Sequence, residues 1–289
     1  MQVEHGVNAS APSAPGQVTF LHSIFLRAGL VLHALALPAV LILVWQLAAV
    51  SGYLPPRMMP SPVKVAETAF DFVLGNSDSP GAYAFSGSFI KHAWVSTLRV
   101  AQGFLLAVLA GVSLGLVLGM SRTIERFVDP ILQVIRPIPI TAWLPLSIMW
   151  FGLGHRATLF LIFLGAFFPV LINTVTGVKL VDRRLIEAAE MLGTRRRQLF
   201  HRILLPAALP SILAGLRIGL GFAWVCLVVG EMTGVGTGLG SAIADARELF
   251  RVDLIIVCML LIGLIGYTSD RLIVYSFRRA LRWSPTLFR

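Results

Sequence analysis

Long runs of apolar residues constrain this chain more than any other feature of its sequence. A helix needs about 20 mostly apolar residues to cross a bilayer, and six stretches meet that requirement. The chain is 56% hydrophobic and 13% charged, about half the charge of a soluble domain. These properties exclude a water-soluble enzyme and a disordered chain, and they predict an all-α fold, a polytopic membrane bundle of about six transmembrane helices. The predicted spans are Gly29–Val50, Val100–Met120, Leu132–Phe151, Ala157–Val178, Ser211–Glu231 and Leu254–Ser276.

The third predicted span is interrupted by Arg136, Pro137, Pro139 and Pro145. Because proline removes a backbone donor and clashes with the preceding turn, we expect this helix to be kinked or broken near its start. A broken helix at membrane depth is tolerated where protein or water covers the freed carbonyl groups. The third span is therefore a candidate wall of a polar pathway.

The basic residues predict an orientation and account for the formal net charge of +10. With the N-terminus in the cytoplasm, fourteen Lys and Arg residues fall in inner segments and seven in outer ones. The positive-inside rule then predicts that both termini are cytoplasmic, and no nucleic-acid partner is needed to explain the charge. Cys226 and Cys258 lie inside apolar runs, and we interpret both as small buried hydrophobes.

Two regions follow from these spans. Residues 1–28 lack the pattern of a cleaved signal peptide and are predicted to form a disordered cytoplasmic tail, while residues 29–289 form the membrane domain. Between the first two spans, apolar spacing predicts an amphipathic helix at the outer surface, followed by the turn-rich loop 75–88. The apolar positions of that helix are Val63, Ala66, Phe70 and Val73.

Glycines recur at a spacing of four in two spans. Gly111, Gly115 and Gly119 lie on one face of the second span, and Gly215 and Gly219 lie on one face of the fifth. Small residues at this spacing let helix backbones approach closely. The pattern predicts close packing, either in a compact bundle or at a dimer face.

The connection between the fourth and fifth spans, residues 179–210, carries the most informative pattern. One apolar helix face ends at Gly193, where a helix naturally stops, and a second short helix is predicted from Thr194 to Leu204. Such a hairpin on the cytoplasmic side must cover its apolar face, and a soluble partner is the natural candidate. The apolar face consists of Leu185, Ala188, Ala189 and Leu192.

This connection contains the pattern EAA, three residues, Gly, nine residues and I-x-L-P, from Glu187 to Pro206. The pattern resembles the EAA loop of ABC-importer permeases and matches the family spacing in full. The resemblance implies a type I ABC-importer permease fold in the bacterial inner membrane, with a cytoplasmic loop that docks on a separate ATP-hydrolysing subunit. The residues that it assigns to this contact are Glu187, Ala188, Ala189, Leu192 and Gly193.

The same resemblance implies the partners: two ATP-binding subunits, a second permease copy and an external substrate-binding protein. No cofactor is expected in this chain, because it lacks a phosphate-cradling glycine loop ending in Lys-Ser/Thr, so ATP belongs to the partner subunit. The single complete EAA loop and the glycine faces favour a homodimer, and a heterodimer stays open.

Further motifs resemble the permease group for sulfonates, taurine, nitrate and bicarbonate. This implies a small organic or inorganic anion as cargo, with aliphatic sulfonate first and taurine, nitrate, bicarbonate or an aromatic acid open. The loop 75–88 is longer than usual in the group, and its role stays open. The motifs are Arg136–Pro139, Ala142–Leu146, Trp150–Gly154, Gly165–Pro169, Asn173-Thr174, Gly215–Gly221 and Arg282–Pro285.

Polar residues inside the spans are the candidates for the pathway. Arg136 and Arg217 carry guanidinium groups that suit an oxyanion, although both lie near predicted cytoplasmic ends, where long side chains reach the headgroups. Trp143 is either a gate beside the broken span or an aromatic-belt residue. The remaining candidates, which line a water-filled path or hydrogen-bond between helices, are Gln102, Asn173 and Thr174.

Two features lie at the predicted outer side. Glu231 closes the fifth span and would repel an anion, so a structural or gating role is favoured over substrate contact. The glycine-rich run 234–240 is interpreted as a flexible turn. The six histidines lack metal-ligand spacing, and no metal site is predicted.

Two other function classes fit less well. An ion-coupled secondary carrier would need coupling-ion residues at mid-membrane or an internal inverted repeat, and an intramembrane enzyme would need paired catalytic groups at one depth. The sequence contains neither pattern. It therefore predicts a transport subunit rather than an enzyme, and dependence on a separate ATPase distinguishes this class from the others.

Overall fold

The computed structural model shows helices throughout the part of the chain that it describes. The chain divides into two compact units, residues 1–63 and 64–289. The predicted tail 1–28, the start of the first predicted span and most of the loop 75–88 lie outside the described residues. The described residues are 36–51, 55, 58–75 and 85–278.

The first unit contains the helix Ala36–Val50, which is the described part of the first predicted span. It is apolar but shorter than the other candidate spans. The indole N–H of Trp45 donates to the carbonyl oxygen of Pro60 at 3.1 Å. This hydrogen bond ties the segment after the helix back to it.

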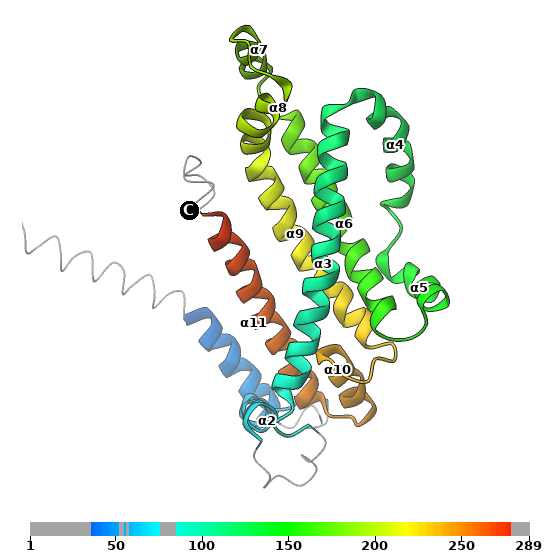
Figure 1. The fold of residues 1–289 in the computed structure, drawn as a ribbon. Helices are drawn as coiled ribbons and strands as arrows, with labels where there is room; N and C mark the ends of the chain where they lie inside the picture. The colour runs from blue at the N-terminus through cyan, green and yellow to red at the C-terminus, as the bar shows by residue number, and fades with distance from the viewer. Residues whose placement is uncertain (1–35, 52–54, 56–57, 76–84, 279–289) are drawn as a thin grey trace, which may run out of the picture. The chain divides into compact units, whose positions relative to one another are not determined.

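Four helices of the second unit are long and apolar enough to cross a membrane, α3, α6, α9 and α11 (Figure 1). They coincide with the second, fourth, fifth and sixth predicted spans, which are confirmed. The second span begins earlier than predicted, at Phe89 instead of Val100. The elements of this unit are α2 (Pro62–Leu74), α3 (Phe89–Met120), α4 (Arg122–Ile135), η1 (Ile140–Trp143), α5 (Leu144–Phe151), α6 (His155–Lys179), α7 (Arg183–Met191), α8 (Arg196–Leu199), η2 (Phe200–Leu204), α9 (Leu205–Glu231), α10 (Leu239–Glu248) and α11 (Val252–Phe277).

The third predicted span is broken, as its prolines predict. Arg122–Ile135 and Ile140–Phe151 meet at an angle of 88°, and the break contains Pro137 and Pro139. Counted as one span, this bent pair brings the number in the described residues to five. The remaining predicted span, the first, is represented there by the helix Ala36–Val50 alone.

The core of the second unit lies where α6 packs against both α3 and α9. A Cβ added to Gly115 of α3 would lie 2.6 Å from the Cβ of Thr174, and one added to Gly215 of α9 would lie 2.6 Å from the Cβ of Asn173. Glycine is what lets these backbones approach so closely. Both glycine faces therefore pack within the chain, as in the compact-bundle alternative, and they no longer argue for a dimer face.

The amphipathic helix predicted before α3 is present as α2. The face that packs on the rest of the unit is not the apolar face that the spacing indicates. Phe70, on the predicted apolar face, is 58% exposed, whereas Thr68 and Phe72 are buried. The hydroxyl of Thr68 donates to the carboxylate of Asp253 at the start of α11, at 2.8 Å. A polar side chain with a tertiary partner can be buried, and apolar spacing alone does not reveal that partner.

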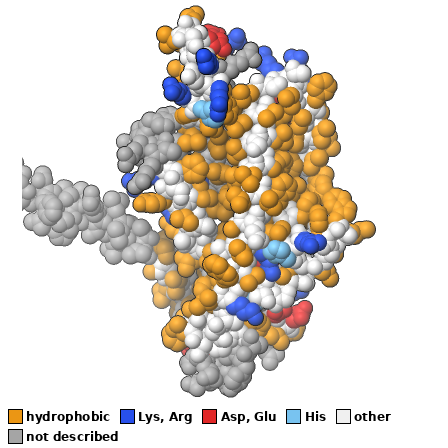
Figure 2. Space-filling view, viewed as in Figure 1, with side chains coloured by type: hydrophobic (Ala, Val, Ile, Leu, Met, Phe, Trp, Pro, Cys, Tyr) orange, Lys and Arg blue, Asp and Glu red, His pale blue; other side chains and the backbone are white. Residues whose placement is uncertain are grey.

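In the second unit, α7 and α10 lie at opposite ends of the long helices (Figure 1). Figure 2 shows hydrophobic side chains over the middle of the visible face, with charged side chains gathered toward its two ends. This distribution is the one expected of a bundle whose middle lies in hydrocarbon.

Candidate functional site

The residues predicted to contact an ATPase belong to one short helix, α7. The side chain of Asp182 caps it by accepting the backbone N–H of Arg184 at 2.9 Å, a donor without a partner inside the helix. Arg183 donates to Glu187 one turn later, at 2.9 Å, and both side chains are exposed. The pair orients the Glu187 carboxylate, but it adds little to stability because water screens it.

The predicted helix end at Gly193 is confirmed. The N–H of Gly193 donates to the carbonyl of Glu190 at 2.9 Å, and the N–H of Thr194 donates to that of Ala189 at 3.1 Å. These two bonds form a Schellman motif, which requires the left-handed backbone that Gly193 adopts, with φ of 73°. The motif turns the chain sharply after α7.

The predicted second helix over Thr194–Leu204 does not stop before the next span. Instead, α8 and a π-helical turn, η2, run directly into α9. Pro206 lies in the first turn of α9, where a missing N–H is tolerated. The helical segment from Arg197 to Glu231 therefore runs from the end at which α7 lies to the opposite end of the bundle.

The helix α7 lies at one end of the bundle (Figure 1), and apolar side chains of α7 and its cap are exposed there. Ala189 is the exception among the predicted contact residues, since it is buried, whereas Glu187 is exposed. Exposed apolar side chains beyond the apolar middle of a bundle indicate a partner. The exposed fractions are 55% for Leu185, 88% for Met191 and 85% for Leu192.

Three of the six predicted pathway residues line one groove of about 350 Å³, which we call the Arg136 groove. Arg136 and Trp143 come from the break between α4 and α5, and Asn173 comes from α6. Most of the remaining lining is apolar, with Phe168 of α6 and Phe222 of α9 among its members. The groove thus joins a cation and an amide to hydrophobic walls.

A proline interrupts α6 where this helix lines the groove. Pro169 has no N–H, so the carbonyl of Gly165, one turn earlier, lacks its helical donor. The carbonyl of Pro169 in turn accepts a side-chain N–H of Asn173 at 2.8 Å. Incompletely bonded backbone is tolerated at membrane depth where it is buried in protein or lines a water-filled cavity. This wall therefore suits a hydrated path.

The other three predicted pathway residues lie elsewhere. Arg217 donates to both carboxylate oxygens of Asp270, at 2.8 and 3.0 Å, so its charge is neutralised between α9 and α11. Thr174 is fully buried and donates to the carbonyl of Val170 within α6. Gln102 is exposed on α3 and does not line the Arg136 groove.

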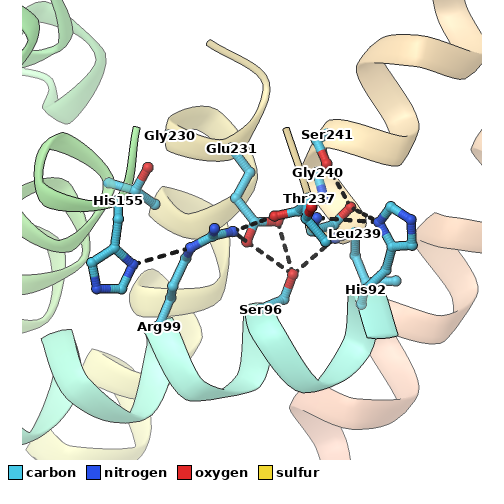
Figure 3. Close-up of polar contacts among 12 residues, drawn as sticks. His92, Ser96, Arg99, His155, Gly230, Glu231, Thr237, Leu239, Gly240 and Ser241 are labelled. Atoms are coloured by element: carbon cyan, nitrogen blue, oxygen red, sulfur yellow. Dashed lines mark hydrogen bonds and ion pairs between the residues drawn. The ribbon is translucent and has the colours of Figure 1, made fainter. Parts of the chain in front are cut away.

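A buried polar cluster lies near α10, at the opposite end from α7 (Figure 3). Arg99 donates to the Glu231 carboxylate and to the carbonyl of Thr237, both at 2.6 Å. The side chains of Arg99 and Glu231 are 8% and 0% exposed. Ser96 Oγ lies 2.8–2.9 Å from both Glu231 oxygens, and the N–H of Gly240 donates to Glu231 at 2.8 Å. The carboxylate is paired and hydrogen-bonded, as a buried charge requires.

The cluster fastens the loop between α9 and α10 to α3. Ser96 accepts the N–H of Leu239 at 2.8 Å, and Nδ1 of His92 lies within hydrogen-bond distance of the N–H and the carbonyl oxygen of Gly238. A Cβ on Gly238 would collide with the Glu231 carboxylate. Residues 237–240 of the glycine-rich run are therefore bonded into the bundle, which corrects the interpretation of this part as a flexible turn.

Hydropathy alone does not reveal this cluster, although the sequence carries a signal for it. The second predicted span begins at Val100 and leaves Arg99 outside it, whereas α3 extends back to Phe89. His92, Ser96 and Arg99 follow one another at spacings of four and three, which places them on one helix face. This polar stripe faces Glu231, the carboxylate for which a structural or gating role was favoured.

Comparison with known proteins places this architecture in a family. Residues 106–282 match the family described as "Binding-protein-dependent transport system inner membrane component". A putative ABC transporter permease protein of Methanocaldococcus jannaschii is 41% identical over 86% of this chain and 91% of its own length. A putative aliphatic sulfonates transport permease protein of Bacillus subtilis is 36% identical over 87% of each chain. A nitrate import permease protein of Synechocystis is 36% identical over 82% of this chain and 84% of its own.

A solved structure of the MetNI methionine ABC transporter, in an inward-facing conformation, has the same fold. Its matching chain is 18% identical, with a TM-score of 0.53 over 65% of this chain and 95% of that one. The fold is thus the type I importer permease fold, and an ATP-binding subunit and a substrate-binding protein are the partners of such a permease. The chain belongs to the inner membrane components of binding-protein-dependent transport systems, and it is a transport subunit rather than an enzyme.

Proposed function

We propose that this permease imports a small organic anion, with an aliphatic sulfonate as the first candidate. Relatives at 36% identity are named for aliphatic sulfonates and for nitrate, so membership of the family leaves the anion open. Taurine, bicarbonate or an aromatic acid would use the same machinery. The Arg136 groove supports an anion, because it holds a guanidinium group among its lining residues.

The observation that carries ATP-driven import, as distinct from the choice of anion, is the exposure of α7 at the end of the bundle. Its EAA residues lie on a short capped helix, and a helical path leads from its cap into α9. We expect α7 to dock in a groove of the ATP-binding subunit, through Glu187, Ala188 and Leu192, while Ala189 and Gly193 fix the shape of the helix. On this proposal α7 and both chain termini are cytoplasmic.

The complete importer would contain two copies of this chain, two ATP-binding subunits and an external binding protein. Closure of the ATP-binding subunits would move both α7 helices, and α9 would carry that movement through the membrane. The bundles would then rock to an outward-open arrangement and receive the anion, and hydrolysis of ATP would reset them. The two copies are expected to be identical.

ATP hydrolysis by the reconstituted importer tests the proposed cargo. The permease, its ATP-binding subunit and its binding protein are placed in lipid and supplied in turn with aliphatic sulfonates, taurine, nitrate, bicarbonate and aromatic acids. Stimulation and uptake by sulfonates above the others are expected. Stimulation by nitrate or bicarbonate alone would replace the sulfonate proposal, and failure of the ATP-binding subunit to co-purify would remove the docking proposal.

Charge reversal at Glu187 tests the docking of α7. The variant E187R should keep its fold and abolish ATP-driven uptake, because Glu187 is exposed and serves the partner rather than the bundle. The matched control is R183A, which breaks the same Arg183–Glu187 pair and keeps the EAA residues. Uptake at the unaltered rate by E187R would show that α7 does not dock through this carboxylate.

A further inference from the structure

The arginines near the ends of the spans differ in their partners. Arg99 is paired with Glu231, and Arg217 is paired with Asp270. Arg136 makes no ion pair or hydrogen bond through its side chain to any residue in the described part of the chain. Arg136 is exposed, and its guanidinium group is therefore available to a ligand. The structure therefore separates the two arginines that the sequence alone offered as equal candidates.

The position of Arg136 supplies the second observation. It follows α4 at the start of the 88° break, where it lines the Arg136 groove of about 350 Å³. That volume falls in the range of small-molecule sites. Asn173 lines the same groove and uses one of its two N–H groups on Pro169, which leaves the other as a donor for an anion.

The walls of the groove specify the rest of the ligand. Trp143, Phe168, Phe222 and neighbouring aliphatic side chains make most of its lining apolar. An anion without a carbon chain, such as nitrate or bicarbonate, would leave these apolar side chains exposed to water. An oxyanion with a short apolar tail would satisfy the guanidinium and cover the walls at the same time.

A second cavity that Arg136 also lines is less suited to an anion. It is lined by Glu125, Asp129 and Lys179 as well as by Arg136. Lys179 pairs with Glu125, and Asp129 accepts a hydrogen bond from Gln133 at 2.6 Å. The two carboxylates in this lining balance its two cations, whereas the lining of the Arg136 groove holds one cation and no carboxylate. An anion is therefore favoured in the groove.

We infer that the Arg136 groove is a binding site for an amphiphilic organic oxyanion, held by Arg136 and Asn173 at its head and by Trp143 and Phe222 along its tail. The inference rests on the proposed function and narrows it, because it selects organic sulfonates over nitrate and bicarbonate within the permease itself. A dissolved sulfonate and the phosphate of an anionic lipid share this chemistry. The experiment must therefore separate these two sources.

The test measures 1-pentanesulfonate binding by calorimetry to the permease–ATPase complex in nanodiscs, without the binding protein. We expect binding to the unaltered complex, at least about tenfold weaker binding to R136Q from the loss of a charge-assisted bond, and partial recovery in R136K. The control R156Q removes an exposed arginine at the start of α6 and should bind pentanesulfonate as the unaltered complex does. F222A should weaken pentanesulfonate but not methanesulfonate.

The outcomes separate the inference from the proposed function. Three outcomes would overturn the inference about the groove, even if the complete importer still takes up sulfonates. They are undetectable pentanesulfonate binding, equal affinity for nitrate and pentanesulfonate, and an unchanged pentanesulfonate affinity in R136Q. Absence of ATP-driven uptake of any organic anion would overturn the proposed function, even if the groove binds pentanesulfonate. Binding in phosphatidylcholine nanodiscs that disappears in phosphatidylglycerol nanodiscs would assign the groove to lipid and overturn the inference. Equal affinity in both lipids supports it.

Discussion

At the level of single residues, the role of a charged side chain in this bundle depends on which groups compensate its charge. The Glu231 carboxylate is fully buried, and it is held by Arg99, Ser96 and the backbone N–H of Gly240 at the start of α10. A buried pair of this kind gives limited net stability, but removal of one member leaves an uncompensated charge. The cluster therefore fixes the position of the loop between α9 and α10. A variant that loses one of the two charges should be less stable than a variant that loses both.

A double-mutant cycle measures that difference. R99M should destabilise the protein by about 3 kcal/mol, because it leaves Glu231 buried without its cation. R99M/E231Q removes both charges and should regain most of the stability. Thermal unfolding of the unaltered protein, R99M, E231Q and R99M/E231Q in one detergent measures the coupling. Equal midpoints for R99M and the double variant would contradict a buried ion pair.

Among the elements, α6 holds the bundle together because its neighbours carry glycines where they cross it. Gly103, Gly115 and Gly119 of α3 each meet a β-branched side chain of α6, and Gly215 of α9 meets Asn173. Helix association in a membrane depends on close packing of this kind, since lipid is as apolar as the side chains. Gly263 of α11 differs, because a Cβ added there meets nothing within 4 Å.

Two glycine substitutions should therefore have opposite signs. G115A places a methyl group against Thr174 and should cost about 1–3 kcal/mol by overpacking. G263A meets open space and should be neutral or stabilising by up to about 1 kcal/mol, because alanine favours a helix. Unfolding midpoints of both variants check this, and a stable G115A would refute the close contact of α3 with α6.

At the scale of the whole molecule, α11 is the span least buried within the chain, at 17% against 56% for the span that includes α9. Polar contacts help to attach it to α9. Arg217 binds both oxygens of Asp270, and the indole N–H of Trp224 donates to Ser269 at 3.2 Å. These contacts fix the register of α11 against α9, whereas apolar packing in lipid specifies register less strongly.

Charge exchange tests that attachment. D270A leaves Arg217 unpaired in the span and should lower the unfolding midpoint and expose α11 to protease. The exchange R217D/D270R restores opposite charges at the same positions and should recover part of the loss. A midpoint for D270A equal to that of the unaltered protein would mean that the pair does not hold α11 in place.

Features that depend on residues close together in the sequence could be predicted from it. Apolar runs located α3, α6, α9 and α11, prolines 137 and 139 located the break, and Gly193 located the end of α7. Each of these effects acts through backbone geometry or the solvation of one segment. Three of the six candidate pathway residues also meet in one groove, because the broken span that carries two of them packs beside α6.

Taken alone, the sequence determined that the chain is a membrane bundle with an EAA helix at one end. Only the tertiary structure decided which charges are paired and which glycines pack on which helix. Arg99 and Glu231 are separated by 132 residues, and Thr68 and Asp253 by 185, so no local pattern reports their contact. The physical reason is that hydropathy describes the exchange of a segment between water and lipid, whereas the partner of a buried polar group depends on how distant segments pack.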